Sequence, residues 1–192
     1  MRIGVLSIQG AVSEHLKHLE RCNVEAVPVK YGKNLAEISG LIIPGGESTT
    51  IGKLIEASGL AEPVKERVHN GTLAVFGTCA GMVLMASDIA DGIENQPILE
   101  LMNTRVKRNA FGRQRESFET ELDFKGLERP LSGVFIRAPI ILEAGNDVEI
   151  LASLPEGIVA ARQANLLVTS FHPELTGDLR LHRIFVDLCK KL

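Results

Sequence analysis

The chain has 192 residues, of which 45% are hydrophobic and 23% are charged, and its formal net charge at pH 7 is −3. This length and composition predict one globular domain, residues 1–192, with a substantial core. The slightly acidic charge argues against a nucleic acid or an anionic membrane as partner, and no apolar stretch approaches the ~20 residues of a membrane-spanning helix.

Strand and helix patterns alternate through the first two-thirds of the chain. Short apolar runs predict strands at residues 2–8, 24–29, 41–43 and 73–76. Helices are predicted at residues 11–22, 49–58 and 62–70, and Gly59 and Gly71 follow the last two as C-caps. The first helix has its apolar face at Val12, Leu16 and Leu19. We therefore expect His15 and His18 to be solvated on its polar side, where a metal site would lack a third ligand.

After residue 100 the pattern changes to closely spaced strands. They are predicted at residues 118–124, 134–138, 148–152, 158–163 and 166–171. Ala164-Asn165 predicts a hairpin turn between the last two. A final helix from residue 179 carries an apolar stripe at Leu181, Ile184, Phe185 and Leu188. Together these elements predict an α/β fold: an open, mostly parallel sheet flanked by helices, with an antiparallel annex in the C-terminal half.

Cys79 stands where a predicted strand turns into a predicted helix. Gly77 and Gly81 flank it two residues away on either side, the arrangement of a sharp turn that lifts a nucleophile clear of a sheet. The N-terminus of the following helix favours the thiolate form of such a cysteine. The alternative is simple packing, which is our interpretation of Cys22 and Cys189. The cysteines show no C-x-x-C spacing, which indicates a reducing cytoplasm and no disulfide framework.

A cysteine nucleophile needs a histidine to transfer protons and an acid to orient that histidine. His172 ends an apolar strand pattern and Glu174 follows two residues later, so both side chains point to one side of an extended segment. His69 and His182 have no acidic or cysteine neighbour that distinguishes them. A structural histidine is the alternative for His172 alone, but the turn at Cys79 together with this pair favours a Cys-His-Glu triad.

Residues 44–50, with the sequence PGGESTT, lie between a predicted strand and a predicted helix. Two glycines there allow backbone N–H groups to approach a ligand closely. The absence of a Gly-Lys-Ser/Thr motif argues against a phosphate loop. We expect this loop to bind the oxyanion of an acyl-transfer intermediate, with Glu47 available for an ammonium group. An ordinary turn with a Ser or Thr helix cap is the alternative.

A basic cluster comprises Arg105, Lys107, Arg108, Arg113 and Arg115. Its segment contains a single aromatic residue, Phe111, whereas surfaces that bind single-stranded RNA carry several aromatic side chains for stacking. We therefore interpret the cluster as a solvated basic loop or as the source of an arginine that binds a carboxylate.

Together these motifs resemble those of the class I, triad-type glutamine amidotransferases. The stretches GTCAG at 77–81 and SFHPE at 170–174 carry the family's triad pattern. Other stretches are similar to one branch, the glutaminase subunit of pyridoxal 5'-phosphate synthase: LSIQGA at 6–11, GLIIPGGESTT at 40–50, RNAFGRQ at 108–114 and FIRAP at 135–139. The resemblance extends from residue 3 to about residue 175 without a departure at the family's functional positions.

The resemblance implies a flavodoxin-like fold and hydrolysis of L-glutamine to L-glutamate and ammonia. Cys79 would attack the amide, His172 would protonate the ammonia and Glu174 would orient His172. The ammonia would pass to a separate (β/α)8-barrel synthase subunit within a hetero-oligomeric complex. That subunit makes pyridoxal 5'-phosphate from ribose 5-phosphate and glyceraldehyde 3-phosphate. For the chain itself the resemblance implies no cofactor and no metal.

The same resemblance assigns further positions. Residues expected around the glutamine are Gly46, Glu47, Ser48, Arg108, Ile136 and Arg137. Backbone N–H groups at Gly46 and Ala80 are expected to form the oxyanion hole. We expect Gln9 and Gly10, at the end of the first strand, in a region that is sensitive to the partner.

Two alternatives remain open at this point. An amidotransferase subunit that serves another synthase, such as the one making imidazole glycerol phosphate, would keep the chemistry, although the GESTT sequence argues against it. A non-catalytic α/β binding module would retain the turn at Cys79 as packing.

Overall fold

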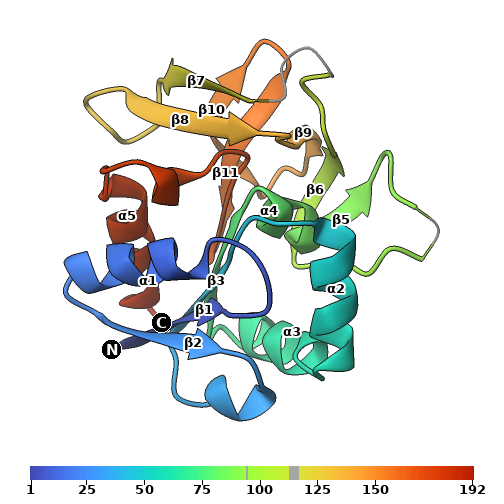
Figure 1. Cartoon of the computed structure of the whole chain (residues 1–192). Helices are drawn as coiled ribbons and strands as arrows, with labels where there is room; N and C mark the ends of the chain where they lie inside the picture. Colours follow the sequence, from blue (N-terminus) through green and yellow to red (C-terminus); the bar gives the residue numbers. More distant parts are fainter. Residues whose placement is uncertain (94, 113–116) are drawn as a thin grey trace.

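The computed structural model describes residues 1–93, 95–112 and 117–192 (Figure 1). The helices are α1 (Val12–Arg21), α2 (Ser48–Ala57), α3 (Ala61–His69), α4 (Ala80–Met85) and α5 (Arg180–Cys189), with 3-10 turns η1 (Gly32–Asn34) and η2 (Pro173–Leu175). The strands of the N-terminal half are β1 (Arg2–Leu6), β2 (Glu25–Val29), β3 (Gly40–Ile43), β4 (Ala74–Thr78) and β5 (Ala86–Ile89). Those of the C-terminal half are β6 (Met102–Lys107), β7 (Ser117–Leu122), β8 (Leu131–Ile136), β9 (Ile140–Ala144), β10 (Glu149–Leu154), β11 (Gly157–Gln163) and β12 (Leu166–Thr169).

Most strands join one mixed sheet in the order β2-β1-β3-β4-β12-β11-β9-β6-β5, with β10 paired to β11. Strands β2, β1, β3, β4 and β12 run parallel to one another. Strand β11 pairs antiparallel with β12, β10 and β9, and β7 and β8 form a separate antiparallel pair. The predicted fold class, a parallel sheet with an antiparallel C-terminal annex, is confirmed.

Helices cover both faces of the parallel part of the sheet (Figure 1). On one face α1 and α5 contribute Leu19 and Phe185 to a core that includes Phe76 of β4. On the opposite face α2 contributes Ile55 to a second core that includes Val75 of β4. Because neighbouring strand residues point to opposite cores, these strands are continuous apolar runs and not alternating ones. None of the helices in the described ranges is long and apolar enough to cross a membrane.

The predicted N-terminal strands and helices end within two residues of the observed ends. The predicted hairpin is also confirmed, because β11 and β12 pair with Gln163 opposite Leu166 and Ala164 has a φ of +49°. Strands β5, β6 and β9 were not predicted. Strand β6 alternates between buried and exposed positions, and its exposed Arg105 and Lys107 gave it the composition of a basic loop.

Candidate active site

The segments that carry the predicted triad and the glycine-rich loop lie at one edge of the sheet, the carboxyl edge of its parallel strands. Strands β4 and β12 are neighbours, with Thr78 opposite Thr169, and the Cys79 N–H donates to the Thr169 carbonyl oxygen at 2.8 Å. The chain then leads from β4 into Cys79 and from β12 towards His172. The glycine-rich loop follows β3, on the other side of β4. This is the edge at which open α/β sheets bind ligands.

Cys79 has a strained backbone conformation, with φ +49° and ψ −103°, at the turn from β4 into α4. Left-handed φ values are uncommon for residues other than glycine and gather at functional sites. Gly81 allows the turn to pack closely, because a Cβ there would overlap the backbone carbonyl oxygen of Ile43. The predicted sharp turn is therefore present. Helix α4, however, is only six residues long and leads directly into β5.

An open cavity of about 420 Å³ lies beside Cys79. Most of the predicted site residues line it: Gly46, Glu47, Ser48, Cys79, Ala80, Arg108, Ile136, Arg137 and His172. Val83, Asn109 and Pro139, which were not predicted, complete the lining. Asn109 and Arg137 have left-handed φ values of +44° and +45°, so with Cys79 three of the seven non-glycine residues of positive φ in the described ranges line this cavity.

His172 and Glu174 form a buried pair at the rear of the cavity. The Nδ1 atom of His172 lies 2.8 Å from Oε1 of Glu174, whose residue is 3% exposed. Burial lowers the pKa of His172, but hydrogen bonding with Cys79 and with Glu174 outweighs burial and raises this pKa to about 10. The Cys79 thiol itself is oriented toward the Ile136 carbonyl oxygen, with Sγ 3.8 Å from it. The structure thus brings the three predicted triad residues together.

The loop between β3 and α2 packs against the triad. A Cβ on Gly45 would overlap Cε1 of His172, so this position requires glycine. Glu47, and not the Ser or Thr that we considered, caps α2: its carboxylate accepts hydrogen bonds from the N–H groups of Thr49 (3.0 Å) and Thr50 (2.8 Å). The hydrogen bond from the Thr50 side chain, with those from the backbone, lowers the pKa of Glu47 to about 2. The side-chain oxygen of Gln9 accepts a hydrogen bond from the Glu47 N–H at 3.2 Å.

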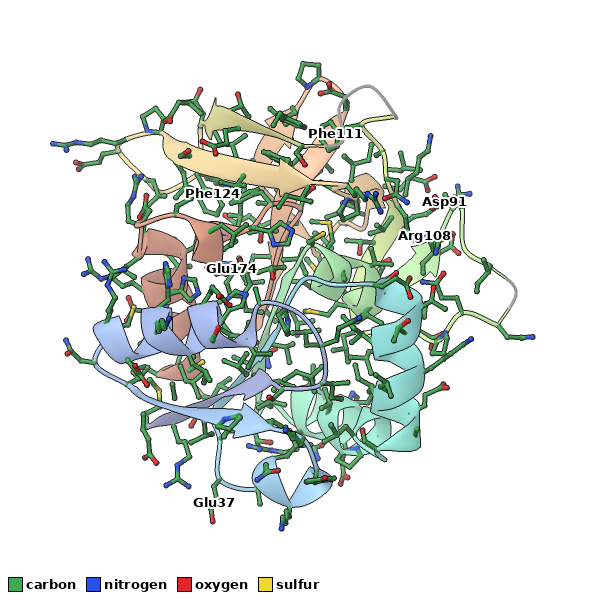
Figure 2. The ribbon with its side chains drawn as sticks, viewed as in Figure 1. Glu37, Asp91, Arg108, Phe111, Phe124 and Glu174 are labelled. Atoms are coloured by element: carbon green, nitrogen blue, oxygen red, sulfur yellow. The ribbon has the colours of Figure 1, made fainter. Side chains whose placement is uncertain are left out.

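The basic cluster is largely paired with acids where the structure describes it. Arg105 forms ion pairs with Asp88 and Glu143, both at 2.9 Å. Arg108 donates from its backbone N–H to Oδ1 of Asp91 at 2.8 Å and from Nη2 to the Asp91 carbonyl oxygen at 2.6 Å (Figure 2). Arg108 also lines the cavity, and its role as a carboxylate-binding arginine stays a prediction. Arg113 and Arg115 lie outside the described residues.

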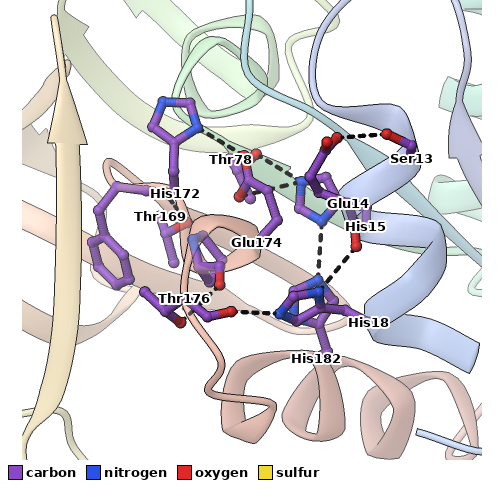
Figure 3. A network of polar contacts seen from close by, with 12 residues as sticks. Ser13, Glu14, His15, His18, Thr78, Thr169, His172, Glu174, Thr176 and His182 are labelled. Atoms are coloured by element: carbon purple, nitrogen blue, oxygen red, sulfur yellow. Dashed lines mark hydrogen bonds and ion pairs between the residues drawn. The ribbon is translucent and has the colours of Figure 1, made fainter. Parts of the chain in front are cut away.

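The expectation that His15 and His18 are solvated was wrong, because both are buried, as is His182 (Figure 3). In the structure α1 turns its histidine face toward β4 and α5. Ring nitrogens of His15 lie 3.0 Å from His182 Nε2 and 3.3 Å from Thr78 Oγ1, and His18 Nε2 lies 3.0 Å from the Thr176 carbonyl oxygen. Partners for the ring nitrogens of His15 and His18 make the burial of these two residues tolerable. The partners are distant in sequence, so no local pattern identifies them.

Comparisons with known proteins agree with this geometry. A family model described as "SNO glutamine amidotransferase family" matches residues 5–191. Proteins named "Pyridoxal 5'-phosphate synthase subunit PdxT" are similar over the whole chain. That of Pelotomaculum thermopropionicum is 55% identical (98% of this chain and 95% of that one covered), and that of Niallia circulans is 52% identical (100% and 99%).

Solved structures show the same relationship. One described as "Crystal structure of glutamine amidotransferase" is 48% identical, covers 98% of both chains and has a TM-score of 0.93. A putative GMP synthase protein from Thermoplasma acidophilum, 16% identical with a TM-score of 0.69 over 100% of this chain and 94% of that one, shares the fold. The strained cysteine turn, the buried His-Glu pair and these full-length matches lead to one conclusion: the chain belongs to the SNO glutamine amidotransferase family.

Proposed function

We propose that this chain is the glutaminase subunit of a pyridoxal 5'-phosphate synthase, which hydrolyses L-glutamine and supplies the ammonia to a synthase subunit. The observation that carries the proposal is the strained Cys79 turn on the same cavity as the buried His172–Glu174 pair. The family membership supports glutamine as the substrate. The relatives named as synthase subunits support a synthase as the partner.

The reaction needs a nucleophile and a proton donor. The Cys79 thiolate adds to the amide carbon of glutamine, and the C–N bond breaks as the His172 imidazolium gives its proton to the leaving nitrogen. Ammonia departs and a γ-glutamyl thioester remains. Neutral His172 then takes a proton from water as the water attacks the thioester, and breakage of the C–S bond releases glutamate and restores the thiolate. The raised pKa of His172 supports the starting imidazolium.

The negative charge that develops on the amide oxygen needs hydrogen-bond donors. Ala80 begins α4, so its N–H has no acceptor within that helix, and it lines the cavity beside Cys79. We assign the Ala80 and Gly46 N–H groups as the oxyanion hole.

The remaining lining residues would hold the amino-acid end of glutamine. We assign its carboxylate to Arg108, with Ser48, Ile136 and Arg137 completing the pocket. Glu47 would attract the ammonium group. Its carboxylate already caps α2, but a carboxylate offers about four lone-pair sites, so an ammonium adds to the capping bonds without replacing them.

Activity is expected to depend on the partner. Gln9 and Gly10 follow β1 at the same edge of the sheet, and Gln9 hydrogen-bonds the N–H of Glu47 in the oxyanion loop. A synthase subunit that moves Gln9 would therefore act on this loop. We expect the isolated chain to be a poor glutaminase until the synthase subunit, a (β/α)8 barrel, is bound; high activity of the free chain contradicts this.

The test is to purify the chain together with the barrel subunit of a pyridoxal 5'-phosphate synthase. Glutamine, ribose 5-phosphate and glyceraldehyde 3-phosphate should then yield pyridoxal 5'-phosphate. Cys79→Ala should abolish ammonia release from glutamine, whereas an ammonium salt should restore product formation. If Cys79→Ala releases ammonia at the original rate, the triad assignment is wrong. Activity with the barrel of imidazole glycerol phosphate synthase instead would identify a different partner.

A further inference from the structure

Behind the candidate active site, two buried histidines form a chain that ends on Glu174 (Figure 3). Oε1 of Glu174 pairs with His172. The other oxygen, Oε2, is buried and has no hydrogen-bond partner of normal geometry among the described residues. The Nε2 atom of His15 lies 3.4 Å from it, and Nδ1 of the same ring lies 3.0 Å from Nε2 of His182. The unpaired oxygen of the triad therefore faces a histidine.

The contacts determine which ring nitrogens carry protons. Burial and the neighbouring His182 hold the pKa of His15 well below its ordinary value, so this ring is neutral and has one N–H. Oxygen atoms of Glu174 and of Thr78 (3.3 Å) face Nε2, which therefore carries the proton. Nδ1 then accepts a hydrogen bond from Nε2 of His182.

His182, the second of the two histidines, fits the same assignment of protons. Burial lowers the pKa of His182 to about 3, so this ring is also neutral and its single proton is on Nε2. Its Nδ1 then has no hydrogen, and this nitrogen is buried without a hydrogen-bond partner in the part of the chain that the structure describes. The N–H of His182 thus points at His15, and the N–H of His15 faces Glu174 and Thr78.

We propose that His15 is a positioning residue of the glutaminase, an inference that rests on the proposed function. His15 holds the Glu174 carboxylate so that Oε1 stays on His172. His182 in turn holds His15 in the required tautomer. The side chains of His15 and Glu174 are both 0% exposed. Packing alone does not require histidines here, because apolar side chains would fill the space without the cost of burying ring nitrogens.

A metal site is the other chemistry that clustered histidines suggest. His15 and His182 direct ring nitrogens at each other and not at a common point. Within the described ranges no group of three His, Cys, Asp or Glu side chains could hold a metal ion. The geometry therefore favours a hydrogen-bonded chain.

Glutaminase kinetics of the complex with the synthase subunit test the proposal. We expect His15→Leu to lower kcat roughly 10- to 100-fold with KM changed less than about twofold, because the polar contact of His15 Nε2 with the Glu174 carboxylate is lost without loss of a substrate contact. His15→Gln keeps an N–H donor near the Nε2 position and should recover most of the rate. His69→Gln is the control, because His69 lies exposed at the end of α3. Its kcat should stay within about twofold of the wild type.

A double-mutant cycle separates positioning from packing. In a Glu174→Ala background, His15→Leu should change kcat by less than about twofold, because His15 acts through Glu174. An equal loss in both backgrounds, an unchanged kcat in His15→Leu, or no recovery in His15→Gln overturns the proposal. If thermal unfolding shows that His15→Leu does not fold, His182→Leu takes its place in the cycle with the same expected losses. A wild-type complex that releases no ammonia refutes the proposed function instead.

Discussion

Replacing Gly45 with alanine tests whether close packing of the loop on His172 is required for catalysis. Gly45 does not have a positive φ, so alanine adds only a methyl group. This methyl would overlap Cε1 of His172 and lie 3.4 Å from Cβ of Cys79. The ring then has to retreat by roughly 1 Å to reach the ~3.5 Å at which carbon atoms pack. Because a misplacement of about 1 Å costs about 100-fold in rate, we expect Gly45→Ala to lower kcat about 100-fold.

The assay is ammonia release by the complete synthase over a range of glutamine concentrations. Gly32→Ala is the matched control, since a Cβ on Gly32 meets nothing within 4 Å and its φ is not positive. Overpacking costs about 1–3 kcal/mol of stability, so thermal unfolding should find Gly45→Ala folded at the assay temperature. A folded Gly45→Ala enzyme with the wild-type kcat would refute the argument, because it would mean that His172 can move without loss of rate.

Three further predictions concern stability. Gly81→Ala should lower the free energy of unfolding by about 1–3 kcal/mol in urea denaturation, because its Cβ overlaps the Ile43 carbonyl oxygen; a loss no larger than that of Gly177→Ala contradicts this. Glu47→Ala should cost about 1 kcal/mol at pH 7 as a lost helix cap. Because the folded pKa of Glu47 is about 2, its contribution is complete above pH 4.5, and the difference from wild type should shrink as pH falls through 2. His172, with its pKa raised to about 10, stabilises the fold fully below pH 6.5 and progressively less as pH rises through 10. The wild-type free energy of unfolding should therefore decline over this range more than that of His172→Gln, and equal slopes would count against the raised pKa.

The central parallel strands β3, β4 and β12 were predictable because they are buried on both faces. Residues 41–43 and 73–76 are short apolar runs bounded by turn residues, and such runs are typical of strands in a parallel sheet covered on both faces. Strand β6 was not predicted because only one of its faces is buried. Its exposed Arg105 and Lys107 are charged and indicated a loop, although Met102, Thr104 and Val106 show the period-two alternation of a strand.

The positions proposed for the triad were predictable because each half of that site is local in sequence. The glycines around Cys79 mark a sharp turn. His172 and Glu174 do meet, but the predicted extended segment was wrong: Glu174 lies in the 3-10 turn η2, and this turn brings its carboxylate to His172. The meeting of Cys79 with this pair follows from strand order, since β4 and β12 are parallel neighbours. The cap at Glu47 was not predictable in the same way. Capping depends on the extended backbone of this residue, φ −94° and ψ 110°, and Ser48 and Thr49 are equally good capping residues by type.

The histidine chain shows the limit of pattern analysis most clearly. By residue type His15 counts as polar, but its spacing places it on the apolar face of α1, three residues after Val12 and four before Leu19. The sequence contains no information about the surface that this face of the helix meets. That surface comprises Thr78 at the end of β4, Glu174 in η2 and His182 on α5, which are 63 to 167 positions away. A polar ring on this buried face departs from the apolar residue types of Val12, Leu16 and Leu19, and residues that violate local patterns in a well-packed fold concentrate at functional sites. A histidine at an apolar-face position is therefore the signal in the sequence on which the role proposed for His15 rests.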